Sequence, residues 1–250
     1  MVRLEEKLNY GAIIIARLKS KRLKEKVLLK INKKNTLIEY IILKLKKLFS
    51  AKNIILATSH KKNDKKILIE AKKNKINYFQ GEAVDVLKRI YLAASKNNFS
   101  DVFVCTADNP LFDLYSVKKM LNFHQKNKND FTSANNMPLG AYGWVLKVSS
   151  IKKIISKKKK KDTEIWGNFF LQNKKMKCKK YNFPLNKKIN HKIRLTVDTI
   201  EDLILVKNVL KLSKTQFPSL VEIDFIIKKN KYLLKINSMI KQKKAPRNVF

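Results

Sequence analysis

Glycine, cysteine and proline are all scarce: the 250 residues contain five glycines, five prolines and two cysteines. The cysteines, Cys105 and Cys178, lie far apart and form no CxxC pair, which excludes a disulfide scaffold and a cysteine-rich zinc site. Neither the GxxxxGK nor the GxGxxG phosphate loop is present. Any phosphate group would therefore be bound by side-chain cations and by backbone N–H groups outside those two loops.

Long apolar runs are missing as well. Near the start, the longest uninterrupted run is residues 12–16, far short of the roughly 20 residues needed to cross a bilayer, and no signal-peptide pattern is present. A hydrophobic fraction of 44% still suffices for a well-buried core. No linker rich in Pro, Gly or Ser divides the chain. We therefore expect a soluble cytoplasmic protein with one domain at residues 1–238 and a lysine-rich tail at residues 239–250.

Acidic residues are few: 19 Asp and Glu oppose 57 Lys and Arg, which gives a net charge of +38. Such a balance is typical of proteins that bind nucleic acid or an anionic surface. Only six of the basic residues are arginines, however, and specific phosphate and base recognition favours arginine. Because lysine is spread along the whole chain, we interpret it mainly as the composition of an AT-rich genome, with nonspecific polyanion binding as a physical consequence. The dense run at residues 157–161 is typical of a solvated loop.

Short apolar runs alternate with segments of helical periodicity. In the first half, the pattern predicts strands at residues 11–17, 53–58, 76–79 and 101–106, and helices at residues 36–49, 64–74, 84–96 and 114–126. In the second half it predicts strands at residues 130–134, 142–148 and 193–197, and helices at residues 163–171, 200–212 and 220–228. The strand at 142–148 could be antiparallel. The alternation predicts an α/β fold with a mostly parallel sheet.

Basic and hydroxyl side chains follow the first predicted strand. Arg17, Ser20, Arg22 and Lys26 come directly after Ala16. In an open α/β sheet, ligands bind beyond the carboxyl ends of the strands, so these side chains and nearby backbone N–H groups could hold a triphosphate. A solvated basic loop in a lysine-rich protein explains the same residues.

Two aspartates, Asp108 and Asp198, each follow a predicted strand. Strand-end carboxylates are suited to Mg²⁺, which takes few protein carboxylates and completes its shell with water and phosphate oxygens. Both positions also have a structural interpretation. The Asp-Asn-Pro sequence at Asp108 is strong turn chemistry, and Asp198 could be a helix cap. Asp113 is expected to cap the next helix, and Thr199 with Asp202 forms a plausible capping box.

Six segments follow one another in the order of a known family's motifs. They are residues 11–29, 55–59, 79–89, 106–111, 162–167 and 195–203. The first has Ala16, Arg17, Ser20 and Arg22 at the spacing of the pattern A-R-x-x-S-x-R-L-P-G-K-V-L. Together the segments resemble the sugar-acid cytidylyltransferases, especially the branch of spore-coat polysaccharide biosynthesis protein F, and the likeness spans residues 11–228.

The resemblance implies a Rossmann-like, three-layer nucleotidyltransferase fold of the GT-A-like type. It implies transfer of CMP from CTP to the anomeric hydroxyl of a sugar acid of the Kdo or nonulosonate kind, with release of pyrophosphate, for polysaccharide or surface-glycan biosynthesis. It also implies Mg²⁺ as the cofactor, and a homodimer as one option for assembly. The alternatives are a nucleotidyltransferase that uses another NTP or a sugar or alditol phosphate, and a non-catalytic protein that binds RNA or an acidic partner.

Carried over position by position, the resemblance assigns roles to residues of this chain. The catalytic residues are Arg17, Lys26 and Asp108, and the metal ligands are Asp108 and Asp198. The nucleotide-binding residues are Ala16, Arg17, Ser20, Arg22, Lys26, Gly81 and Asp85. Of these, the basic residues and Ser20 would lie along the triphosphate, and the last two near the base and ribose. We add Asn135 and Glu164 as weaker candidates for the acceptor pocket.

The chain departs from the family pattern in the phosphate-binding segment. Lys24 and Glu25 replace a Pro-Gly pair, and Lys19 and Ala107 each replace a common glycine. A glycine lets backbone approach phosphate closely, whereas a Cβ limits that approach. A carboxylate at Glu25 is unfavourable beside a polyphosphate unless it points away, so activity depends on where this side chain lies.

Overall fold

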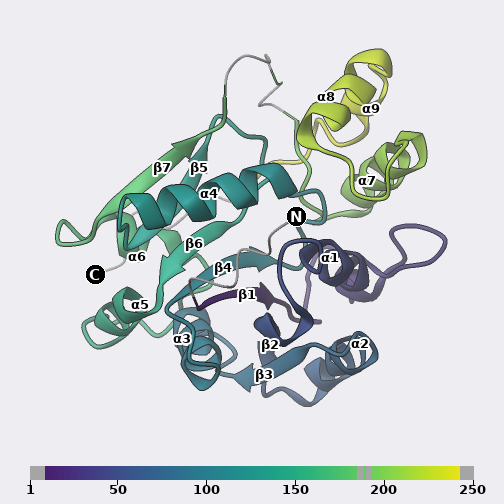
Figure 1. The fold of residues 1–250 in the computed structure, drawn as a ribbon. Coiled ribbons are helices and arrows are strands. Elements are labelled where there is room, and N and C mark those ends of the chain that lie inside the picture. The colour runs from purple at the N-terminus through teal and green to yellow at the C-terminus, as the bar shows by residue number, and fades with distance from the viewer. Residues whose placement is uncertain (1–8, 185–188, 190–192, 243–250) are drawn as a thin grey trace.

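The structure is a computed structural model that describes residues 9–184, 189 and 193–242 (Figure 1). Its centre is a seven-stranded sheet of order β3-β2-β1-β4-β6-β5-β7. The strands are β1 (Tyr10–Ile15), β2 (Ile54–Ser59), β3 (Asn77–Gly81), β4 (Asp101–Thr106), β5 (Phe131–Asn135), β6 (Trp144–Lys147) and β7 (Cys178–Asn182). Within this sheet β6 pairs antiparallel with both of its neighbours, and every other pairing is parallel. The predicted α/β class with a mostly parallel sheet is confirmed.

Helices cover both faces of the sheet, which makes a three-layer structure (Figure 1). One face packs against α3 (Val86–Lys96), α5 (Val148–Ile155) and α6 (Gly167–Leu171). The other packs against α1 (Leu37–Leu45), α2 (Ile67–Lys73), α4 (Leu114–Lys126), α7 (Ile200–Leu212), α8 (Leu220–Lys229) and α9 (Leu233–Ile236). Strands buried on both faces need apolar side chains in both directions, which is why β1 contains an unbroken apolar run.

The predicted helix caps are confirmed. Asp113 Oδ2 accepts from the Ser116 backbone N–H at 2.8 Å and begins α4. The side chain of Thr199 accepts from the backbone N–H of Asp202, whose side chain in turn accepts from the Thr199 backbone N–H, which closes the capping box of α7. These caps place the start of each helix directly after a loop that leaves the carboxyl edge of the sheet.

Some predicted elements differ from the structure. Residues 193–197 form no strand; Arg194 makes one isolated bridge with Leu139, and Val197 N–H donates to the Asp108 carbonyl at 2.7 Å. Edge strand β7 was not predicted, because half-exposed Lys-rich residues give no apolar pattern. The antiparallel direction of β6 is confirmed.

Two further expectations concern the chain as a whole. No helix in the part of the chain that the structure describes is both long and apolar enough to span a membrane. The division into a domain at residues 1–238 and a tail at residues 239–250 stays a prediction, and residues 243–250 lie outside the described residues.

Candidate active site

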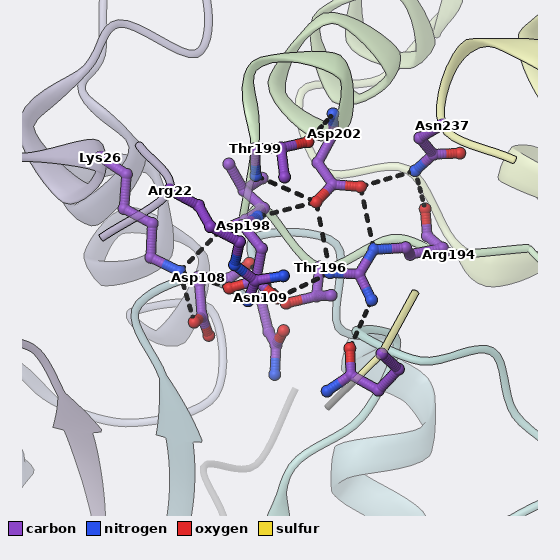
Figure 2. Close-up of polar contacts among 12 residues, drawn as sticks. Arg22, Lys26, Asp108, Asn109, Arg194, Thr196, Asp198, Thr199, Asp202 and Asn237 are labelled. Atoms are coloured by element: carbon purple, nitrogen blue, oxygen red, sulfur yellow. Dashed lines mark hydrogen bonds and ion pairs between the residues drawn. The ribbon is translucent and has the colours of Figure 1, made fainter. Parts of the chain in front are cut away.

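Three loops meet at the carboxyl ends of β1 and β4, and each contributes a charged side chain (Figure 2). Lys26 begins the short 3-10 helix η1 (Lys26–Leu28) in the connection after β1, Asp108 lies in the loop after β4, and Asp198 lies just before α7. Lys26 Nζ donates to Asp108 Oδ2 at 2.8 Å, to Asp198 Oδ1 at 2.9 Å and to the Val197 carbonyl at 2.8 Å. An ammonium has three donors, so all three are used. Side chains far apart in the sequence thus converge on one point, as predicted.

Asp198 is held by three cations. Its Oδ2 forms an ion pair with Arg22 at 2.9 Å and accepts a hydrogen bond from Arg194 at 2.6 Å, while its Oδ1 accepts from Lys26. Burial by itself raises the pKa of the Asp198 carboxyl, but the charge of Lys26, with further contributions from Arg22 and Arg194, outweighs burial and lowers it. Asp198 is therefore a carboxylate at neutral pH.

Asp108 is the more accessible of the two carboxylates. Its Oδ1 accepts from the Thr106 hydroxyl at 2.6 Å, and the Thr106 oxygen accepts from the Asn109 side chain at 3.0 Å. The Asp108 backbone carbonyl bonds to Val197, which joins the two aspartate loops directly. This backbone link explains how the loops keep their carboxylates together without a strand at residues 193–197.

The rest of the segment after β1 divides into two groups. Arg22 lies with Lys26, but Arg17 turns to Glu164 and donates to both oxygens of its carboxylate. Ala16 extends the pairing of β1 with β2, because its backbone N–H donates to the Ala57 carbonyl at 3.1 Å. Glu164, predicted for the acceptor pocket, is thereby placed beside a predicted phosphate-binding residue.

Glu25, the family's glycine position, has a left-handed backbone with φ 48°. The chain thus keeps the conformation that glycine adopts most easily, at a cost of about 1–2 kcal/mol for a residue with a Cβ. Its carboxylate pairs with Lys66 at 3.5 Å, so it is drawn toward that surface lysine instead of standing alone beside the phosphate-binding segment.

Gly81 and Asp85 lie at a second position on the same edge of the sheet, between β3 and α3. Asp85 caps α3 through Oδ1, which accepts from Lys88 N–H at 3.1 Å and from the Thr163 hydroxyl at 3.0 Å. Its Oδ2 pairs with Lys158 Nζ at 2.5 Å. The structure thus gives Asp85 a scaffolding role, and its predicted contact with the nucleotide stays a prediction.

The contacts around Asp85 also correct one interpretation of the sequence. The run at residues 157–161 is not wholly a solvated loop, because the Lys158 side chain is only 5% exposed. At Gly81 an added Cβ would lie 2.8 Å from the Phe79 ring and 3.0 Å from Arg89 Cγ, so close packing explains the glycine. Asn135, at the end of β5, bonds to the Asn182 side chain at 3.0 Å, two strands away from β4.

Comparison with known proteins identifies the family of this chain. The sequence pattern of a family described as cytidylyltransferase matches residues 11–245, nearly the whole chain and both aspartates. The chain belongs to the cytidylyltransferase family. It is a nucleotidyltransferase enzyme, as the resemblance implied.

Several similar proteins support the assignment. An uncharacterized protein, MJ1063 from Methanocaldococcus jannaschii, is 34% identical over 92% of this chain and 95% of its own length. A cytidylyltransferase from Leptospira borgpetersenii has a similar structure, with a TM-score of 0.82 and 26% identity over 90% of this chain and 96% of that one.

More distant structures share the fold. A CMP:2-keto-3-deoxy-manno-octonic acid synthetase complexed with CTP has a TM-score of 0.63 and 12% identity over 81% of this chain and 98% of that one. Rv0371C from Mycobacterium tuberculosis H37Rv, in complex with manganese, has a TM-score of 0.56 and 10% identity over 80% of this chain and 98% of that one. At these identities the similarity establishes the fold of this cytidylyltransferase and nothing finer.

The donor set of this cytidylyltransferase fits a divalent cation. Asp108 and Asp198 both direct an oxygen at the Lys26 ammonium, so the pair already converges on one positive charge. No group of three or more His, Cys, Asp or Glu side chains within the described ranges could hold a metal alone. Two carboxylates completed by water and phosphate oxygens are the usual ligands of Mg²⁺ in nucleotide enzymes.

The sequence pattern did not single out two residues of this cytidylyltransferase that lie behind the paired aspartates. Arg194 pairs with Asp198, and its spacing of four residues before that aspartate is a signal that could have identified it. The Asn237 side-chain amide donates to Asp202 Oδ1 at 2.8 Å. Asn237 lies near the end of the described chain, and no local pattern points to it.

Proposed function

We propose that this cytidylyltransferase transfers CMP from CTP to a sugar acid in the cytoplasm, with release of pyrophosphate. The observation that carries the proposal is the convergence of Lys26, Asp108 and Asp198, with Arg22 beside them. A carboxylate pair next to two cations on one loop is the arrangement that a metal-bound triphosphate requires. The family assignment supplies the cytidine nucleotide.

The proposed reaction needs alignment and charge neutralisation and no covalent enzyme intermediate. The anomeric hydroxyl oxygen of the acceptor bonds to the α-phosphorus of CTP, the bond from that phosphorus to the pyrophosphate oxygen breaks, and the hydroxyl proton is released. Arg22 and Lys26 would exchange their aspartate partners for phosphate oxygens. A divalent cation, Mg²⁺ in this proposal, would be held by Asp108 and Asp198 and would neutralise charge on the phosphates.

Two observations point to a sugar acid as the acceptor. The resemblance points to sugar acids, and the distant structural neighbour named above is a synthetase for one such acid. Arg17 is about half exposed beside Glu164 at the same edge, where a cation is available for an acceptor carboxylate and a carboxylate for its hydroxyls. We therefore propose that the acceptor lies against this pair.

Pyrophosphate release tests the proposal. CTP, UTP, GTP and ATP are each combined with Mg²⁺ and with Kdo, N-acetylneuraminate, a sugar phosphate or an alditol phosphate. We expect release only with CTP and a sugar acid, and a loss of about 100-fold or more in Asp108→Asn, because the substitution removes charge from a metal ligand. Release with a sugar phosphate instead would overturn the proposal that the acceptor is a sugar acid. Unchanged turnover in Asp108→Asn would overturn the proposed metal ligand.

A salt series separates the enzyme from a simple basic surface. RNA bound to the dispersed lysines should dissociate steeply as salt rises and should bind Asp108→Asn as well as the parent protein. CTP binding that disappears together with RNA binding at raised salt would show that CTP meets only the basic surface, and would overturn the proposed triphosphate site.

A further inference from the structure

Arg194 joins the metal-site aspartate to a buried carboxylate behind it. Arg194 Nη2 donates to Asp198 Oδ2 at 2.6 Å, and its Nε and Nη2 donate to the two oxygens of Asp202 at 3.0 Å and 3.3 Å. The side chain of Asp202 is fully buried and that of Arg194 nearly so. A guanidinium with donors on two carboxylates in this way has little freedom to move.

Asp202 is itself fixed from several directions (Figure 2). Its Oδ2 accepts from the backbone N–H groups of Asp198 at 2.9 Å and Thr199 at 3.1 Å. From beyond α9, buried Asn237 donates to Asp202 Oδ1 at 2.8 Å and to the Arg194 carbonyl at 3.1 Å. The start of α7, the guanidinium and the chain after α9 therefore meet at one carboxylate.

The three cations on Asp198 differ in how firmly they are held. Arg194 is anchored from behind by Asp202, whereas Lys26 and Arg22 come from the segment proposed to bind triphosphate. The Arg22 side chain is 35% exposed. When phosphate oxygens compete, Lys26 and Arg22 can leave, and Arg194 stays. One oxygen of Asp198, Oδ2, would then remain paired while Oδ1 becomes available.

We propose that Arg194, fixed by Asp202 and Asn237, is a positioning residue that keeps Oδ2 of Asp198 occupied and presents Oδ1 to the divalent cation. Asn237 would thus tune metal affinity although it touches neither metal nor substrate. The inference rests on the divalent cation of the proposed function. Partners of this kind, one shell behind a metal ligand, commonly change metal affinity by about 10-fold or more.

Asn237→Ala tests this inference, with Asn230→Ala as the matched control. The Asn230 side chain also donates to a backbone carbonyl, that of Ile226 at 2.8 Å at the end of α8. Binding of Mn²⁺ is measured by electron paramagnetic resonance with CTP present and no acceptor. We expect Asn237→Ala to weaken Mn²⁺ binding about 10-fold and to raise the KM for Mg²⁺ similarly, with kcat at saturating metal within about threefold. Asn230→Ala should change none of these.

A second variant keeps the inference testable if Asn237→Ala does not fold. Arg194→Lys retains a positive charge near Asp198 but loses the fork that binds two carboxylates, so Mn²⁺ affinity should fall between those of the parent and Arg194→Met. Affinity within twofold of the parent in a folded Asn237→Ala or Arg194→Lys protein would overturn the inference. So would a parent protein that binds no Mn²⁺. If the parent binds Mn²⁺ but transfers no CMP, the proposed function fails, and Mn²⁺ affinity still decides this inference.

Discussion

Two carboxylate clusters lie on the same edge of the sheet and are built differently. At the ends of β1 and β4, Asp108 and Asp198 share the ammonium of Lys26, the first residue of the short 3-10 helix η1 (Lys26–Leu28). Beyond β3, Asp85 caps its own helix and pairs with Lys158, which is buried. The first cluster contains cations that a phosphate could attract away. In the second cluster both oxygens of the aspartate are committed to the fold, so it is a scaffold.

The clearest way to break this comparison is to remove one carboxylate from each cluster. Asp198→Asn should reduce CMP transfer by about 100-fold or more while leaving the protein folded, because a carboxylate charge is lost at the proposed metal site. Asp85→Ala should retain much of the transfer rate at low temperature. It should lower the free energy of unfolding by about 2–4 kcal/mol, since a helix cap is lost and Lys158 stays buried without its partner.

Steady-state kinetics and urea unfolding of both variants supply the measurements. The comparison is wrong if Asp85→Ala loses as much activity as Asp198→Asn at unchanged stability. That result would return Asp85 to the nucleotide-binding role implied by the resemblance.

Lys26→Met tests whether the Lys26 ammonium occupies the position proposed for the divalent cation. Transfer should fall by about 100-fold because a phosphate-binding charge is lost. In the absence of nucleotide, however, Mn²⁺ should bind more tightly than to the parent, since no ammonium competes for Asp108 and Asp198. Isothermal titration with Mn²⁺ is the measurement, and Lys24→Met, in the same loop, is the control. Weaker Mn²⁺ binding to Lys26→Met than to Lys24→Met would contradict the idea.

A buried lysine beneath the Asp108 loop predicts how stability varies with pH. Lys44 is fully buried, donates to the Pro110 carbonyl at 3.3 Å and lies 4.9 Å from the centre of the Phe112 ring. Burial lowers the pKa of Lys44 to about 7, against the opposing charge of Asp113. The unfolded chain then holds a proton that the folded chain lacks between about pH 7 and 10, so stability should rise with pH in that window.

Lys44→Met should flatten this rise and should raise the free energy of unfolding at pH 7 by about 2–4 kcal/mol. Urea unfolding at pH 7, 8 and 9 measures both effects. Above pH 10 the buried tyrosines should lower stability as the pH rises. Burial raises the pKa of Tyr10 and Tyr40, so the unfolded chain releases protons that the folded chain keeps. An equal slope in parent and variant would show that Lys44 is not the titrating group.

The smallest expected effect concerns Glu25. Glu25→Gly should stabilise the fold by about 0.5–1 kcal/mol by relieving the left-handed backbone, and should raise CTP affinity about twofold by removing a negative charge. Glu25→Ala keeps the strain and removes the charge, so it should improve CTP affinity alone. Urea unfolding and CTP titration of the pair separate the two causes. Equal stability of the two variants would rule out backbone strain.

Much of the fold could be predicted because its signals are local. The bounds of α4 and α7 agree with prediction, since each helix begins at a capping side chain and continues with apolar residues at helical spacing. The buried strand β4 was equally clear from its apolar residues. Residues 193–197 misled the prediction: they are buried and carry β-branched and apolar residues at alternate positions like a strand, but the backbone N–H groups of Leu195 and Val197 donate to the loop carbonyls of Leu139 and Asp108.

The sequence by itself determined which chemistry was available: a few well-placed aspartates, a cationic segment after β1 and too few glycines for a standard phosphate loop. Only the tertiary structure decided how the aspartates divide between the two clusters. Asp85 and Asp198 both stand close to the start of a helix, and apart from the family resemblance no residue pattern separates them. The difference lies in partners distant along the chain, Lys158 for one and Lys26 for the other. A carboxylate becomes a scaffold or a ligand according to which cation the fold brings to it and how freely that cation can leave.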